Sequence, residues 1–139
     1  MKYILDTCCV SELFKPAPEP KVADWVIRQD QQALFLSVVT LGEIQKGIAR
    51  LPASERTGRL SGLFNRFLED FSERILTLDR DTMLRWGSLV GRLDADGSRP
   101  PVLDSLIAAT ALTQGMEVVT RNVKDLERCG VRVVNPWSE

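Results

Sequence analysis

The chain has 139 residues, 44% of them hydrophobic and 27% charged, which is long enough for one domain with its own hydrophobic core. Its 18 basic and 19 acidic side chains leave a net charge of -1, which excludes nucleic-acid binding through a general basic field. The absence of histidine excludes Ser-His-Asp triads, Cys-His nucleophiles and zinc sites built on cysteine and histidine.

The number of cysteines and the length of the apolar segments indicate where in the cell the protein is located. Three cysteines, Cys8, Cys9 and Cys129, are an odd number and do not form a disulfide framework, which is typical of a reducing environment. No signal peptide and no apolar stretch approaching about 18 residues is present. We therefore expect a cytoplasmic protein with no membrane partner.

Five strands alternate with helices along the chain. The first strand is a short apolar run, residues 2–7, that is closed by Asp6 and leads into helix-like sequence. Further strands are predicted at 33–38, 75–78, 117–120 and 131–134. Helices are predicted at about 21–31, 40–51, 54–72, 79–93 and 102–113, with a loop and short helix at 121–126. This alternation favours a parallel sheet covered on both faces.

Several residues mark where the predicted helices begin and end. Thr40 and Glu43 have the Thr-x-x-Glu spacing of a capping box, Ser54 opens the next helix, and Asp79 can cap the one after. The helix at 102–113 is apolar almost all round, as expected of a buried helix, and Gly115 is its natural stop. The inner face of the helix at 54–72 is predicted to carry Leu60, Leu63, Phe64, Phe67 and Phe71.

Four acids fall on one edge of the predicted sheet. Asp6 ends the first strand and Asp125 follows the fourth, while Glu43 and Asp104 lie in the first turns of helices. Helices in such folds run antiparallel to the strands, so helix starts and strand ends share an edge, where ligands bind. Neither a dinucleotide-binding glycine motif nor a P-loop follows any strand.

Unpaired carboxylates without histidine repel one another unless cations neutralise them. Mg²⁺ or Mn²⁺, which accept oxygen ligands, are the natural counter-charge. Two such ions about 3.5 to 4 Å apart would clamp the attacking water and the leaving oxygen of a phosphodiester. The acids therefore point to metal-dependent hydrolysis.

Each acid also has a simpler interpretation. Glu43 is explained by its capping box, Asp104 by the helix macrodipole, and Asp125 by a surface or capping role. Asp6 is the hardest to explain in this way, because a carboxylate that ends a central strand has no capping duty and is costly to bury unpaired.

Four motifs in order along the whole chain carry a resemblance to a known family. They are Tyr3-Ile4-Leu5-Asp6-Thr7 with Val10-Ser11-Glu12, Ser37-Val38-Val39-Thr40-Leu41-Gly42-Glu43-Ile44 with Gly47, the run from Val102 to Ala111, and Val119-Thr120-Arg121-Asn122-Val123-Lys124-Asp125-Leu126. The chain, including its closing Asn135-Pro136-Trp137, resembles the PIN-domain ribonucleases of the VapC toxin type.

This resemblance implies a fold, an activity and partners. The fold is a three-layer α/β/α PIN-like single domain over residues 1–139, with a mainly parallel five-stranded sheet of order 3-2-1-4-5. The activity is that of a Mg²⁺-dependent endoribonuclease, the toxin of a bacterial toxin–antitoxin pair. Its expected partners are RNA, a VapB-like antitoxin and a second copy in a homodimer.

The resemblance also assigns residues. Asp6, Glu43 and Asp104 take the metal-site positions, and the fourth position falls to Asp125 or, through water, to Asn122. A departure is Cys8, because the family usually has Asn after Asp-Thr.

Supporting roles are expected of two sets of residues. Those expected to hydrogen-bond the acids, water or phosphate are Thr7, Ser11 and Thr120. Those expected to contact phosphates are Lys46, Arg50, Arg121 and Lys124, with ordinary solvated charges as the alternative.

Two rival functions stay open. Cys8 and Asn122 suggest a catalytically impaired PIN-like module that binds RNA or protein without turnover. A Mg²⁺-dependent receiver-type domain also gathers acids at a strand edge. It fits less well, because no adjacent acidic pair precedes the end of the first strand and Asp79 has no matching lysine.

Overall fold

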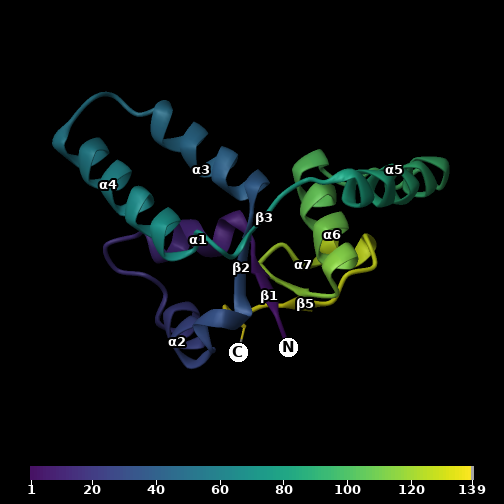
Figure 1. Cartoon of the computed structure of the whole chain (residues 1–139), viewed down its shortest axis with the longest axis horizontal. Coiled ribbons are helices and arrows are strands. Elements are labelled where there is room, and N and C mark those ends of the chain that lie inside the picture. Colours follow the sequence, from purple (N-terminus) through teal and green to yellow (C-terminus); the bar gives the residue numbers. More distant parts are fainter. Residues whose placement is uncertain (139) are drawn as a thin grey trace.

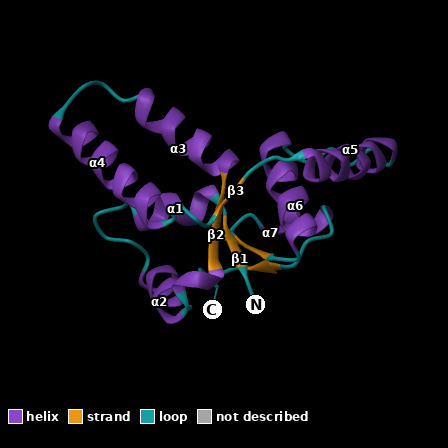
Figure 2. Cartoon of the chain, viewed as in Figure 1, coloured by secondary structure: helices purple, strands orange, loops and turns teal. Residues whose placement is uncertain are grey.

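Five short parallel strands form one sheet in the order β3-β2-β1-β4-β5 (Figures 1 and 2). The computed structural model describes residues 1–138. The strands are β1 Tyr3–Leu5, β2 Leu34–Ser37, β3 Ile75–Leu76, β4 Glu117–Val119 and β5 Val133–Val134. β1 is central, since Ile4 pairs with Phe35 on one side and with Val118 on the other. The predicted order and parallel direction are confirmed.

The helices begin and end largely where their caps predict. They are α1 Thr7–Leu13, α2 Pro20–Arg28, α3 Val38–Ala49, α4 Glu55–Asp70, α5 Arg80–Ala95, α6 Val102–Gln114 and α7 Val123–Arg128, with a 3₁₀ turn at Gln31–Ala33. The Ser54 hydroxyl accepts the Thr57 N–H at the start of α4, and Asp79 caps α5. Gly115, at φ +68°, ends α6 in a conformation that glycine adopts without strain.

Alternating side chains of the sheet build two hydrophobic cores, one on each face. Ile4 and Val118 pack with Ile107 of α6 and Leu126 of α7. On the other face, Leu5 and Val119 pack with α1, α2 and α4. Figure 1 shows α5, α6 and α7 on one side of the sheet and α1, α2 and α4 on the other. The predicted three-layer α/β/α arrangement is therefore confirmed.

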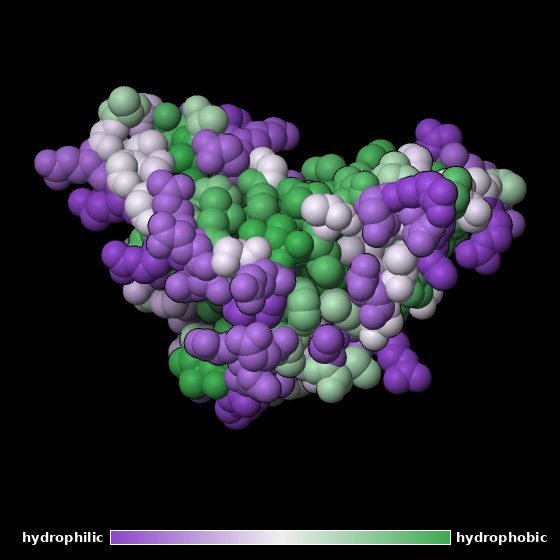
Figure 3. Space-filling view, viewed as in Figure 1, coloured by the Kyte–Doolittle hydropathy of each residue, from purple (hydrophilic) through white to green (hydrophobic). Residues whose placement is uncertain are grey.

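Two burial predictions are wrong in part. Leu63, predicted on the inner face of α4, is 44% exposed, because α3 and α4 project from the sheet as a pair (Figure 1). Phe64 of α4 and Phe71, which follows the helix, are buried as predicted. The first turn of α6 is not buried, since Val102 is 60% exposed and Leu103 42%. Figure 3 shows apolar surface between α3 and α6.

The extent of the domain stays a prediction. Residues 3–134 contain all the strands and helices described above, while Glu139 lies outside the described residues. Within residues 1–138, no helix is both long and apolar enough to cross a membrane.

Candidate active site

The carboxyl edge of the sheet gathers the predicted acids. Asp6 directly follows β1, and Asp104 lies in the first turn of α6 as predicted. Glu43 comes from α3, which follows β2, and Asp125 from α7, which follows β4. Four segments far apart in the sequence thus meet at one edge because all strands run in the same direction.

Asp6 is 5% exposed and held from both sides. Its Oδ1 accepts the Thr7 backbone N–H at 2.8 Å, so Asp6 is the N-cap of α1, and the prediction that it has no capping duty is wrong. Its Oδ2 accepts the Thr120 hydroxyl at 2.7 Å, across 114 residues of sequence. The Asn122 N–H donates to the same hydroxyl oxygen at 2.9 Å, which fixes Thr120. Asp6 is therefore oriented by hydroxyl and amide donors and not by a base.

Cys8, in the first turn of α1, ties the start of that helix to the loop after β4. Its Sγ lies 3.6 Å from Asp6 Oδ2 and 3.3 Å from the Thr120 hydroxyl, and it accepts the Arg121 N–H at 3.5 Å. Burial and the Asp6 carboxylate raise the pKa of the Cys8 thiol, so this side chain is neutral at neutral pH. The thiol thus bridges Asp6 and the β4–α7 loop. Cys8 stands at the position where the resemblance leads us to expect an asparagine.

Glu43 has no capping role in this structure. α3 starts three residues earlier than its sequence suggests, because the Ser37 hydroxyl accepts the Val39 N–H and caps the helix. The predicted capping box at Thr40 and the placement of Glu43 in a first turn are therefore wrong. Thr40 is buried within the helix, and its Oγ1 lies 3.2 Å from the Thr7 hydroxyl.

The carboxylate of Glu43 is turned toward the acids instead. It accepts the Thr7 hydroxyl at 2.5 Å. Thr7 therefore links Asp6, through its backbone, to Glu43, through its side chain. The capping interpretation no longer competes with a role in the site.

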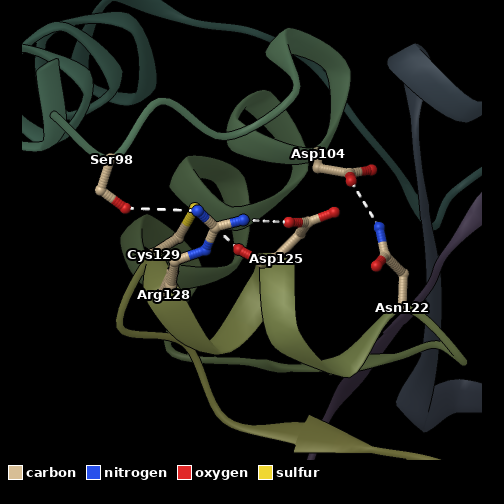
Figure 4. Close-up of polar contacts among 6 residues, drawn as sticks. All are labelled: Ser98, Asp104, Asn122, Asp125, Arg128 and Cys129. Atoms are coloured by element: carbon tan, nitrogen blue, oxygen red, sulfur yellow. Dashed lines mark hydrogen bonds and ion pairs between the residues drawn. The ribbon is translucent and has the colours of Figure 1, made fainter.

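The pKa of Asp104 reflects its burial and the nearby acids. Burial first, and then the carboxylates of Asp6, Asp125 and Glu43, raise the pKa of Asp104 to about 6. One partner opposes this rise: Asn122 Nδ2 donates to Asp104 Oδ2 at 2.6 Å (Figure 4). Oδ1 of Asp104 takes part in none of the described hydrogen bonds.

Asp125 is engaged by a base. Arg128, one turn later on α7, donates to its Oδ1 and also reaches the Ser98 hydroxyl at 3.3 Å (Figure 4). Sequence analysis missed Arg128 and Ser98. The i, i+3 spacing of Asp125 and Arg128 is a signal for the first, whereas Ser98 lies in a loop 30 residues away and carries none.

The remaining predicted residues divide into three groups. Thr7, Thr120 and Asn122 contact the acids directly. Ser11, Lys46 and Arg50 are exposed, and none of the described contacts joins them to an acid. Arg50 follows the last turn of α3, which leads away from the sheet (Figure 1). Lys124 and Arg121 belong to the segment after β4, beside the acids.

The donor atoms fit a hard divalent cation. All four acids offer oxygen, crowding raises the pKa of Asp104, and positive compensation within this cluster comes from Arg128 alone among the described ion pairs. In the described residues, no three acid or cysteine side chains are arranged around one ion position. Each carboxylate is turned toward a protein donor, so side-chain rotation would have to complete a ligand set.

Comparison with known proteins agrees with this geometry. The PIN domain family model matches residues 3–130. The VapC ribonuclease Y4jK of Sinorhizobium fredii is 33% identical, over 96% of this chain and 96% of its own. Toxin FitB of Neisseria gonorrhoeae is 28% identical, over 98% and 99%.

A solved structure shares the fold closely. The crystal structure of FitAcB from Neisseria gonorrhoeae superposes with a TM-score of 0.93 at 28% identity and covers 99% of both chains. Sequence motifs, family model and fold agree along the chain. This chain belongs to the PIN domain family, and its resemblance to the VapC type is confirmed.

Proposed function

We propose that this protein is a metal-dependent endoribonuclease and the toxin of a VapBC-type toxin–antitoxin pair in the cytoplasm. Relatives that align along nearly the whole chain, VapC ribonuclease Y4jK and Toxin FitB, support both parts of this proposal. The expected cofactor is Mg²⁺, with Mn²⁺ as a substitute.

The observation that carries the proposal is the convergence of Asp6, Glu43 and Asp104 at one sheet edge. These carboxylates crowd one another, as the raised pKa of Asp104 reflects, and neutral groups orient them. Like charges at close range are costly in a half-buried site unless a cation joins them. A bound divalent ion would turn this repulsion into binding energy.

The chain's own residues divide the work of hydrolysis. Asp6, Glu43 and Asp104 would hold the cation, which supplies an activated water and neutralises charge on the phosphate. Thr120 orients Asp6, Thr7 orients Glu43, and Asn122 orients Asp104.

Asp104 is also suited to handle a proton. Its Oδ1 is free of the Asn122 bond, so this oxygen can accept a proton from a water molecule within hydrogen-bond distance. We assign to this oxygen the proton that leaves the attacking water. Asp125 would join the acids only after separating from Arg128.

RNA cleavage by matched variants tests the proposal. Asp6→Ala and Asp104→Ala should abolish Mg²⁺-dependent cleavage of RNA, and chelation with EDTA should abolish it in the unaltered protein. The control is Asp30→Ala, since Asp30 is also an acidic helix cap but precedes β2 and so lies at the other edge of the sheet. Cleavage by either site variant at the wild-type rate would refute the assignment.

A catalytically impaired binding module is the second candidate. It is favoured by the Asp125–Arg128 pair, which occupies the fourth acid, and by Cys8 in place of an asparagine. It predicts that RNA or antitoxin binds with no turnover at any Mg²⁺ or Mn²⁺ concentration. Cleavage at millimolar Mg²⁺ would eliminate it.

Antitoxin binding and homodimer formation complete the proposal. Exposed apolar side chains of α5 and α6, Leu84, Val102 and Leu103, offer a surface for a second copy. Light scattering after size exclusion should give twice the mass of one chain for the unaltered protein, and Leu103→Glu should reduce the measured mass to that of one chain. Expression should arrest growth, and a small antitoxin encoded beside the toxin, or Asp6→Ala, should relieve the arrest.

A further inference from the structure

An arginine at the rim of the acid cluster stacks on an aromatic ring. The guanidinium carbon of Arg121 lies 4.8 Å from the centroid of the Trp137 ring. Arg121 is exposed and takes part in none of the ion pairs among residues 1–138. Its charge is therefore not paired with a carboxylate.

The backbone of Arg121 is fixed beside the acids. It directly follows Thr120, whose hydroxyl donates to Asp6, and its own N–H donates to Cys8 Sγ at 3.5 Å. The root of the side chain is thus tied to the same loop contacts that orient Asp6. The stack on Trp137 then sets the direction of the guanidinium.

Trp137 is held in place independently of Arg121. The backbone N–H of Trp137 donates to Asn135 Oδ1 at 3.0 Å. The Thr120 backbone N–H donates to Val134 O, which brings the segment after β5 beside the β4–α7 loop. The ring packs against the core around Leu5.

Packing, and not a hydrogen bond, sets the orientation of this ring. The indole N–H is buried beside the Glu12 carboxylate and is one of the groups that lower the pKa of Glu12. No side-chain hydrogen bond of ordinary geometry holds the indole N–H among the described contacts. Packing against the core therefore keeps one face of the ring toward Arg121.

A stacked guanidinium keeps its donors available. The cation–π contact uses the face of the group, while its five N–H donors point outward in a fixed plane that matches a phosphate. Arg128 differs, since it pairs with Asp125 and also donates to Ser98, so its charge is already offset by a carboxylate. Lys46 also differs, because no described contact holds its side chain. Arg121 alone combines a fixed direction with unused donors among the cations compared.

We propose that Trp137 is a positioning residue that holds Arg121 to bind an RNA phosphate next to the acid cluster. This inference rests on the proposed ribonuclease function and adds a phosphate subsite to it. The fixed stack lowers the entropy cost of each phosphate contact, so both residues contribute to RNA affinity through one interaction.

RNA binding without cleavage tests the proposal. An Asp104→Asn background removes the proposed base and keeps an oxygen for Asn122 Nδ2, so a fluorescein-labelled single-stranded RNA can be titrated intact at several salt concentrations. Arg121→Ala should weaken binding about fivefold and lower the slope of log K against log salt by about 0.7. Trp137→Leu should weaken binding about threefold, and Trp137→Phe, which keeps an aromatic face, should restore most of the affinity. The Arg121→Ala/Trp137→Leu double variant should bind no more weakly than Arg121→Ala.

The control is a cation–π pair at the opposite edge of the sheet. Lys2 precedes β1 and lies 5.4 Å from the Phe35 centroid, so Lys2→Ala removes an exposed cation without touching the rim. It should leave RNA affinity unchanged. Additive losses at Arg121 and Trp137, or equal binding by Trp137→Leu and Trp137→Phe, would overturn the positioning role.

The outcomes separate this inference from the proposed function. Unchanged RNA binding by Arg121→Ala, with Mg²⁺-dependent cleavage by the unaltered protein, overturns the subsite alone. Absence of both RNA binding and cleavage in the unaltered protein overturns both proposals. If circular dichroism shows that Trp137→Leu unfolds, the RNA affinity of Trp137→Phe is compared with that of Arg121→Ala. Binding by Trp137→Phe that is as weak as binding by Arg121→Ala refutes the inference.

Discussion

The crowding of the acids predicts that Asp104→Asn stabilises the metal-free protein. A folded-state pKa of about 6 against an ordinary value of 3.8 corresponds to about 3 kcal/mol of unfavourable interaction for the ionised carboxylate. Asp104 is half-buried, so solvent screening reduces this to about 1 to 2 kcal/mol. The charge also gains about 0.5 kcal/mol from the start of α6, which leaves about 1 kcal/mol in favour of the variant.

The effect has a defined pH window. Because the pKa of Asp104 is higher in the folded state than in the unfolded chain, its ionisation favours unfolding. The destabilisation begins as pH rises through about 4 and is complete above about 6. Wild type and Asp104→Asn should therefore be equally stable near pH 4, and the variant should gain about 1 kcal/mol, or about 4 °C in Tm, by pH 8.

Urea unfolding in EDTA, followed by tryptophan fluorescence between pH 4.5 and 8, measures this difference. Asp81→Asn is the matched control, because Asp81 also lies in the first turn of a helix but is exposed and is not among the carboxylates that raise the pKa of Asp104. It should lose a few tenths of a kcal/mol. Adding Mg²⁺ at 100 times its Kd should stabilise the wild type by about 2.7 kcal/mol and reverse the order. A difference in the free energy of unfolding between Asp104→Asn and wild type that does not change with pH would refute the electrostatic reasoning. A variant that is less stable than wild type at pH 8 would also refute it.

Two further predictions concern the groups that orient the acids. Thr120→Val removes the hydroxyl bond to Asp6 Oδ2 and should cost about 1 to 3 kcal/mol in urea unfolding, whereas Thr120→Ser should stay close to wild type; equal losses would assign the effect to packing. Arg128→Gln frees Asp125 and should tighten Mg²⁺ binding several-fold in isothermal titration calorimetry, and an unchanged affinity would remove Asp125 from the ligand set.

The gathering of the acids at one edge of the sheet was predictable, because it depends on the direction of the chain alone. Once the strands alternate with helices, Asp6 and Asp104 must meet at the carboxyl edge, whatever the local details. The start of α3 was not predictable in the same way. Thr40 and Ser37 both have capping side chains, and Ser37 takes the role because Thr40 is buried against Thr7, a contact that spans 33 residues.

The partners of the fourth acid also depend on tertiary contacts. Sequence alone leaves Asn122 and Asp125 as alternatives for one position. The structure gives each a different partner, since Asn122 bonds Asp104 and Asp125 pairs with Arg128 (Figure 4). Asn122 therefore acts on Asp104 through a hydrogen bond. Asp125 contributes mainly charge, as one of the groups that raise the pKa of Asp104.

Neutral donors and bases have separate places in this site. Thr7, Thr120 and Asn122 orient three acids without neutralising them, so their negative charge stays available to a cation. Phosphate has the same sign as these acids and would be repelled from an edge that carried them alone. Arg121 lies at the rim, where it can offset that repulsion without competing for the carboxylates. The proposed RNA binding would thus depend on the arrangement of charges at one edge more than on the chain's net charge of -1.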